Sequence, residues 1–160
     1  MSFELSPRRS SGELRSLALR NEILETNERS AEYGLRLTES DAAMLVKAGA
    51  DAISEQDRIE FGKSVTVRLI DRFMQSSFIP QNEYADTIAA LLDIFYEVKE
   101  ESLELLGDDE VIEIMFGFFE GESGGSLELL GGRDMDCLCG KIRRAALGIA
   151  EDGDEEDADD

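Results

Sequence analysis

The pattern of apolar and polar residues along the chain predicts helix over most of its length. One helix should begin near Gln81, because apolar residues then recur at i, i+4 and i+7 on one helix face: Tyr84, Ile88, Leu91, Leu92, Phe95 and Val98. A broad apolar stripe also predicts a helix over 58–78, which Ile79-Pro80 would end. Because residues 65–67 are β-branched, a short strand is an alternative for part of that segment.

Capping residues and glycines indicate where other helices begin and end. A first helix is expected over about 12–33, since the glycine of Tyr33-Gly34 suits the left-handed position that follows a helix. Thr38 is expected to cap the backbone N–H of Asp41 and to start a helix over about 39–54. Gly49 either weakens this helix or allows another helix to approach it closely.

The C-terminal third predicts three more helices. Asp108 or Asp109 is expected to cap a helix that is apolar on nearly every side and should therefore be central. Ser126 should cap a short helix over 127–130, and a last helix should cover about 134–150. We expect an all-α fold: a single compact domain, 12–150, of about six helices, five long and one short.

Charge is distributed unevenly along the chain. Asp and Glu number 37 against 16 Lys and Arg, for a net charge of −21, and this balance argues against a nucleic-acid partner. Residues 1–11 are expected to form a flexible arm, and residues 151–160 a disordered acidic tail with eight acids and no base. The tail either keeps the protein soluble or docks on a basic partner.

The residue types that are missing limit the chemistry. The 160 residues include no histidine, which removes the commonest general base and the commonest metal ligand. Cys137 and Cys139 lack the further ligands that a metal site needs, so no cofactor is predicted. A Ser or Cys nucleophile would lack a histidine base, so no catalytic residue is predicted either. No apolar run near 18 residues and no signal-peptide pattern is present, which predicts a cytoplasmic protein with reduced thiols and no membrane contact.

Paired glutamates are the candidate metal ligands. Glu97 and Glu100 precede Glu110 and Glu113, so each pair is spaced i, i+3 on a predicted helix. Two helices with such pairs could hold Mg²⁺, which prefers oxygen ligands, and could support nucleotide or phosphate-ester hydrolysis. The other interpretation is a solvated acidic helix face, since such spacing arises easily in an acid-rich chain.

Arg58, Glu60 and Phe61 form a second candidate group, in the sequence Arg-Ile-Glu-Phe-Gly. Arg58 and Glu60 could form a buried ion pair that fixes the helix over 58–78. The alternative is a functional role, in which these residues form a polar patch in a groove that binds a partner.

Several short segments together resemble an uncharacterised family of small bacterial proteins, found largely in Firmicutes and classed as a domain of unknown function. The matching segments lie between about residues 25 and 140: Asn27-Glu28-Arg29, Tyr33-Gly34-Leu35, Arg58-Ile59-Glu60-Phe61-Gly62, Ser76-Ser77-Phe78-Ile79, Phe95-Tyr96, Lys99-Glu100-Glu101-Ser102 and Gly125-Ser126-Leu127. The resemblance implies a bacterial, cytoplasmic, helical protein and brings no known activity.

Three functions follow as alternatives. The first is a non-enzymatic protein-interaction or accessory module with an unknown protein partner. The second is a Mg²⁺-dependent hydrolase that uses the four glutamates. The third is an acidic protein that imitates nucleic acid, which requires a regular acidic stripe on the folded surface. Sequence gives no indication of the oligomeric state.

Overall fold

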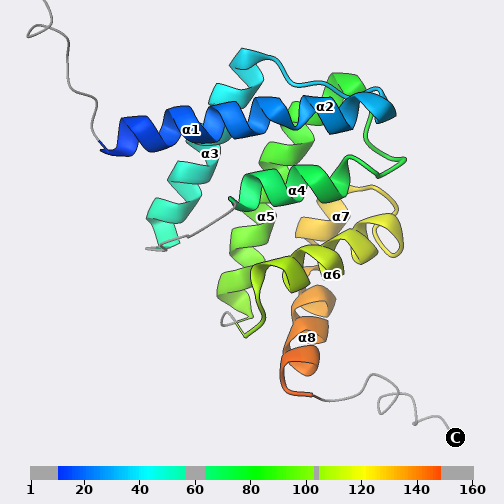
Figure 1. Ribbon diagram of the computed structural model, residues 1–160. Helices are drawn as coiled ribbons and strands as arrows, with labels where there is room; N and C mark the ends of the chain where they lie inside the picture. The colour runs from blue at the N-terminus through cyan, green and yellow to red at the C-terminus, as the bar shows by residue number, and fades with distance from the viewer. Residues whose placement is uncertain (1–10, 57–63, 103–104, 149–160) are drawn as a thin grey trace, which may run out of the picture.

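The computed structural model describes residues 11–56, 64–102 and 105–148 (Figure 1). All regular structure in these ranges is helical, which confirms the all-α fold class. Six of the helices have nine or more residues, one more than the five expected. The elements are α1 (Ser11–Glu25), α2 (Asn27–Ser30), η2 (Ala31–Tyr33), α3 (Glu39–Gln56), α4 (Val65–Phe73), η3 (Gln81–Glu83), α5 (Tyr84–Glu101), α6 (Asp108–Glu120), α7 (Leu127–Gly131) and α8 (Met135–Ala146).

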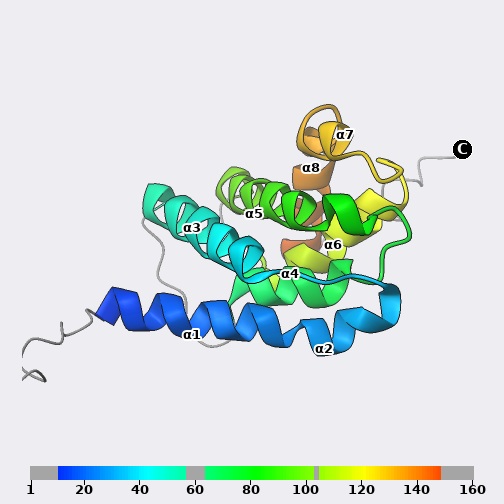
Figure 2. The ribbon, with the colours of Figure 1, turned by 90° about the horizontal axis from the view of Figure 1, so that it is seen from above.

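Helix α5 is the centre of the domain. It contacts α3, α4, α6, α7 and α8, and the views in Figures 1 and 2 show these helices arranged around it. The apolar face predicted for this helix is confirmed, since all six of its residues are fully buried. Burial of a large apolar side chain stabilises a fold by about 1.5–3 kcal/mol, so this face is a main source of stability.

The first predicted helix is interrupted. The chain leaves regular helix at Thr26, whose buried hydroxyl donates a hydrogen bond to the Ile23 carbonyl, and continues as α2 and η2. Figures 1 and 2 show α1 and α2 following one another along one side of the molecule. The predicted end is confirmed, because Gly34 has a φ of 75° in the left-handed region.

The capping prediction for α3 is confirmed by its contacts. Thr38 Oγ1 accepts the Asp41 N–H at 3.0 Å, and Asp41 Oδ2 accepts the Thr38 N–H at 2.9 Å, so the two residues cap the helix reciprocally. Gly49 is buried, and a Cβ placed there would lie 3.4 Å from Thr66 Oγ1 of α4. That distance is an ordinary van der Waals contact, so α4 could pack against alanine at this position as well as against glycine.

Helix α4 is shorter than predicted. Ser64 has extended backbone angles, and its Oγ accepts the Val67 N–H at 3.1 Å, so the helix begins at Val65 and not near residue 58. The helix ends at Phe73, five residues before the predicted end. Residues 65–67 are helical, so the alternative of a strand there is wrong.

The C-terminal helices correct two further details. Neither Asp108 nor Asp109 caps α6; the N-cap is Gly107, whose N–H donates to Glu110 Oε1 at 2.9 Å. Helix α6 also has a solvent-exposed side, since the Glu113 side chain is 58% exposed. Ser126 does cap α7, because its Oγ accepts the Leu129 N–H at 3.1 Å, and α8 ends at Ala146.

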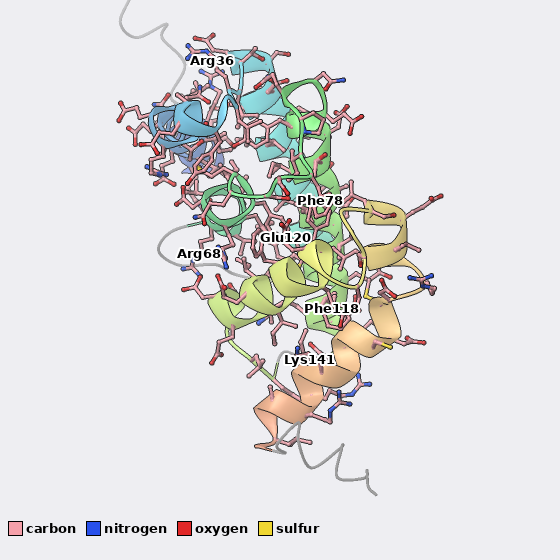
Figure 3. All side chains as sticks on the ribbon, turned by 90° about the vertical axis from the view of Figure 1, so that its right-hand side faces the viewer. Arg36, Arg68, Phe78, Phe118, Glu120 and Lys141 are labelled. Atoms are coloured by element: carbon pink, nitrogen blue, oxygen red, sulfur yellow. The ribbon has the colours of Figure 1, made fainter. Side chains whose placement is uncertain are left out.

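The loop after α4 packs against the loop after α6. The Ser76 hydroxyl hydrogen-bonds the Glu120 carboxylate, and the Phe78 ring lies directly against Gly125, where a side chain would have no space (Figure 3). Gly125 has a φ of +82°, which favours glycine. This contact holds the C-terminal end of α4 close to α6.

Candidate functional site: a polar trough along α4

Helix α4 has one buried face and one polar face. Val65, Leu69, Ile70 and Phe73 are buried in the core. Arg68, Asp71 and Arg72 lie at i, i+3 and i+4, so they share the opposite face, and Gln75 follows one turn later. This polar face runs between α2 and α6, and charged residues from both sides reach it.

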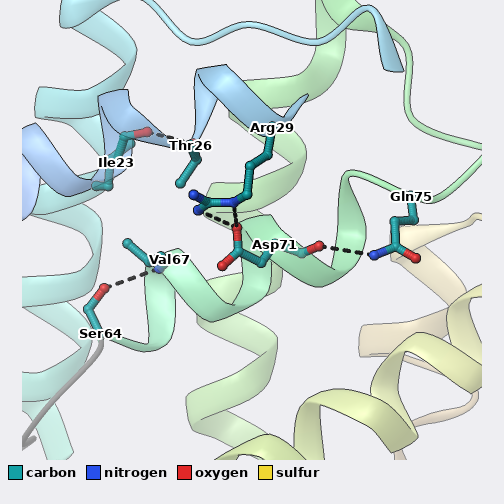
Figure 4. A network of polar contacts seen from close by, with 7 residues as sticks. All are labelled: Ile23, Thr26, Arg29, Ser64, Val67, Asp71 and Gln75. Carbon is teal, nitrogen blue, oxygen red and sulfur yellow. Dashed lines mark hydrogen bonds and ion pairs between the residues drawn. The ribbon is translucent and has the colours of Figure 1, made fainter. Parts of the chain in front are cut away.

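On the α2 side, Arg29 binds Asp71. Its Nε and Nη2 donate to Asp71 Oδ1 at 2.9 and 2.6 Å, and the Gln75 side-chain amide donates to the Asp71 main-chain carbonyl at 3.5 Å (Figure 4). The two charged side chains are 51% and 27% exposed. Because water screens such a pair, it contributes no more than about 1 kcal/mol, and a partner can rearrange it at small cost.

On the α6 side, two arginines of α4 meet acids of α6. Arg72 Nε lies 2.7 Å from Glu113 Oε2, and its guanidinium is centred 3.9 Å from the centroid of the Phe116 ring. Arg68 Nη1 lies 3.5 Å from Asp109 Oδ1. The cation–π contact fixes the plane of the Arg72 guanidinium, which a carboxylate alone would not do.

Two hollows lie along this polar face, and Asp71 lines both. One has a volume of about 380 Å³ and the other of about 600 Å³. We call the two together the α4 trough. The first is lined by Arg68, Asp71, Arg72, Asp109, Ile112 and Glu113, and the second by Glu28, Arg29, Glu32, Tyr33, Asp71, Met74 and Gln75.

The trough combines an exposed aromatic residue with an excess of acid. Tyr33 is 50% exposed, although its side chain carries a large apolar ring. Five carboxylates and three guanidiniums line the trough, so it is negative overall. Tyrosine and arginine are the residue types that most often dominate the binding energy of protein interfaces. The arrangement suits recognition of a protein segment with more bases than acids.

Tyr84 lies in the core close to the Arg29–Asp71 pair. Its side chain is fully buried, and its hydroxyl has no hydrogen-bond partner among the described residues. Burial raises the pKa of Tyr84 from 10.0 to about 12; the nearby Ser30 hydroxyl opposes this rise, and the Asp71 carboxylate adds to it. This phenol therefore stays neutral across the physiological range.

The four glutamates proposed as metal ligands have separate surroundings. Glu97 and Glu100 are exposed on α5, Glu110 accepts the Gly107 N–H, and Glu113 pairs with Arg72. Across the described ranges, no group of three or more His, Cys, Asp or Glu is placed to hold a metal ion. The structure therefore does not bring the four together.

The other sequence candidates lie elsewhere. Arg58, Glu60 and Phe61 fall outside the described residues. Cys137 is exposed and Cys139 is buried, both as free thiols, and burial raises the pKa of Cys139. In the part of the chain that the structure describes, no helix is long and apolar enough to cross a membrane.

The residues of the trough were not singled out from sequence. A usable signal was present, because Arg68, Asp71, Arg72 and Gln75 interrupt the apolar stripe of their segment at helical spacing. Their partners on α2 and α6 were not predictable, since ion pairs across 42 residues depend on how the helices pack.

The chain folds as an all-α domain with a polar, solvent-open trough along α4. The chain matches the family of unknown function DUF6323 over residues 22–148, and it belongs to that family. The match covers α2 to α8 and therefore the whole trough. No curated protein and no solved structure matches the chain.

Proposed function

We propose that this chain is a non-enzymatic interaction module of the bacterial cytoplasm, and that the α4 trough binds a basic segment of a partner protein. The observation that carries the proposal is the pair of hollows that Asp71 lines on both sides, with the exposed Tyr33 among the residues that line the larger one. Free Cys137 and Cys139 are consistent with a reducing compartment.

Charge supports a basic partner. The net charge of −21 attracts a basic segment at long range, and the acid excess in the trough attracts it at short range. Tyr33 offers apolar contact area, and water-exposed pairs such as Arg29–Asp71 can exchange partners at small cost. Binding of this kind should be fast and sensitive to salt.

The hydrolase alternative has less support. Glu110 already accepts a hydrogen bond at the start of α6, and Glu113 already pairs with Arg72, so both side chains have structural roles. The nucleic-acid mimic requires a regular acidic stripe, whereas arginines alternate with acids along the trough. Neither alternative is supported by an observation comparable to the trough.

The test is photocrosslinking in the native host followed by affinity measurement. A photoreactive phenylalanine at position 33 should crosslink a basic protein, and the same probe at Leu147, 66% exposed on the far end of α8, should not. With the captured partner purified, Tyr33→Ala should weaken binding by about tenfold or more, as for an interface anchor. Leu147→Ala is the matched control and should leave the affinity within about twofold.

Two results would contradict the proposal. Equal crosslinking at positions 33 and 147 would show that the trough is not the binding surface. An unchanged affinity in a folded Tyr33→Ala variant would remove the anchor on which the proposal depends.

A further inference from the structure

The larger hollow of the α4 trough, on the α2 side, contains more acids than its base can pair with. Three acids and one base are among the described residues that line it: Glu28, Glu32, Asp71 and Arg29. The base is already engaged, because Arg29 donates to Asp71 from Nε at 2.9 Å and from Nη2 at 2.6 Å (Figure 4). Glu28 and Glu32 are therefore left without a base in this hollow.

Glu28 and Glu32 are open to a ligand. Both are exposed, and neither makes a hydrogen bond or ion pair with another residue in the part of the chain that the structure describes. Tyr33 follows Glu32 directly, lines the same hollow and is 50% exposed. An aromatic ring and two carboxylates thus face one hollow, and a cation can bind them without breaking a contact within the described residues.

The smaller hollow, on the α6 side, is different. Arg68 Nη1 lies 3.5 Å from Asp109 Oδ1, and Arg72 Nε lies 2.7 Å from Glu113 Oε2. A cation that entered this hollow would have to compete with these two arginines for their acids. Of the two hollows, the larger one is therefore the better place for a positive group of a ligand.

The chemistry of the larger hollow suits an arginine side chain. A guanidinium is planar and carries five N–H donors, so it can serve two carboxylates at once and still stack on an aromatic ring. A lysine ammonium is a compact and strongly hydrated point charge, which does not match the ring and both acids together. The volume of about 600 Å³ is within the range of sites that enclose small ligand groups.

We propose that the larger hollow is the specificity pocket of the trough: an arginine of the partner's basic segment pairs with Glu28 and Glu32 and stacks on Tyr33. This inference rests on the proposed function, and it names the side chain that the partner must carry. Arg29 keeps its pair with Asp71 in the complex, so the wall between the two hollows stays as it is. Glu28 and Glu32 are specificity-determining residues in this arrangement.

The test uses a defined probe, a blocked peptide in which glycine alternates with arginine. Amide NMR titration of the full chain at about 100 mM NaCl, where the Debye length is about 10 Å, limits the attraction from distant acids. Addition of the peptide should shift the signals of residues 28–33. The same peptide with citrulline, the neutral isostere of arginine, should bind about tenfold more weakly, and the lysine peptide about threefold more weakly.

A double variant assigns the arginine to the two acids. Glu28→Gln with Glu32→Gln should weaken the arginine peptide by about tenfold and reduce its advantage over the citrulline peptide to about twofold or less. The matched control is Asp93→Asn with Glu128→Gln, which removes the same charge from exposed acids that have no partner among the described residues. These acids lie on α5 and α7, and Figure 2 shows α7 on the opposite side of the molecule from α2. The control should leave the affinity within about twofold.

Several results would overturn the arginine pocket. Equal weakening by the two double variants would show general attraction to an acidic surface. Equal affinities for the arginine peptide and either the citrulline or the lysine peptide would contradict the guanidinium contacts, as would shifts that lie away from residues 28–33. The proposed function fails by a different result, an unchanged affinity of the captured partner for a folded Tyr33→Ala variant. If Tyr33→Ala weakens that partner and the Glu28→Gln, Glu32→Gln variant does not, the arginine pocket alone is wrong.

Discussion

Among the residues that the structure describes, Lys99 has the most deeply enclosed charge. Its side chain is 3% exposed, and its Nζ donates to the Leu106 carbonyl at 2.6 Å and lies 3.0 Å from Asp108 Oδ1. These contacts tie the end of α5 to the start of α6. Lys99→Ala removes the buried ammonium from the Leu106 carbonyl and from Asp108 Oδ1, so we expect a loss of about 2–4 kcal/mol in the free energy of unfolding.

Urea unfolding followed by circular dichroism measures this loss. Lys47→Ala is the matched control, because Lys47 pairs with Asp51 at 3.2 Å but is 77% exposed. That change should cost less than about 0.5 kcal/mol. Equal losses in the two variants would show that the enclosed pair contributes no more than a surface pair.

Tyr84 is expected to respond in the opposite direction. Its buried hydroxyl lacks a partner among the described residues, so Tyr84→Phe removes a desolvated polar group and keeps the ring. We expect the free energy of unfolding at pH 7 to stay the same or to rise by about 1 kcal/mol. A loss of more than about 1 kcal/mol would reveal a hydrogen bond that the hydroxyl makes in solution.

The raised pKa of Tyr84 also predicts a pH dependence. Below pH 10 the phenol is protonated in both states; between pH 10 and about 12 the unfolded chain loses the proton while the folded chain keeps it. Stability therefore falls as pH rises through this window, by up to about 2–3 kcal/mol. Tyr84→Phe should reduce that fall in urea titrations at pH 9, 10 and 11, whereas Tyr33→Phe, at an exposed position, should not.

At the scale of the element, the start of α4 depends on one hydroxyl. Ser64 Oγ accepts the Val67 N–H, and α4 has only nine residues, so its first turn is a large part of the helix. Ser64→Ala should lower the free energy of unfolding by about 1 kcal/mol. Ser64→Asp keeps an acceptor at the cap and should recover most of the loss in the same urea experiment. Equal destabilisation by both substitutions would contradict a capping role.

Elements with a local signal were predictable, and those set by packing were not. Gly34 and the Thr38–Asp41 cap act within a few residues, and the buried face of α5 follows from its own periodicity. The break at Thr26 was not predictable, because the helical spacing of apolar residues continues past it. The α4 trough is the extreme case, because its walls come from segments more than 40 residues apart in sequence.

At the scale of the whole molecule, net charge is the property with the widest consequences. With −21 on 160 residues, repulsion among carboxylates opposes the compact state, and it acts over distances longer than any single ion pair. The exposed pairs that salt would weaken, such as Arg29–Asp71, contribute about 1 kcal/mol or less each. Screening should therefore remove more repulsion than attraction.

We accordingly expect NaCl to stabilise the protein. Between about 20 mM and 300 mM NaCl the Tm should rise by roughly 2–4 °C for each kcal/mol of repulsion removed, and the rise should level off as the Debye length falls below the charge spacing. A full-length chain in which the eight acids of residues 151–160 are replaced by Asn and Gln should show a smaller rise, because it carries eight fewer negative charges. A linear rise that continues to 1 M and is equal in both chains would indicate preferential exclusion of salt and not screening. A fall in Tm would mean that attractive pairs, above all those lining the trough, outweigh the repulsion of the excess acid.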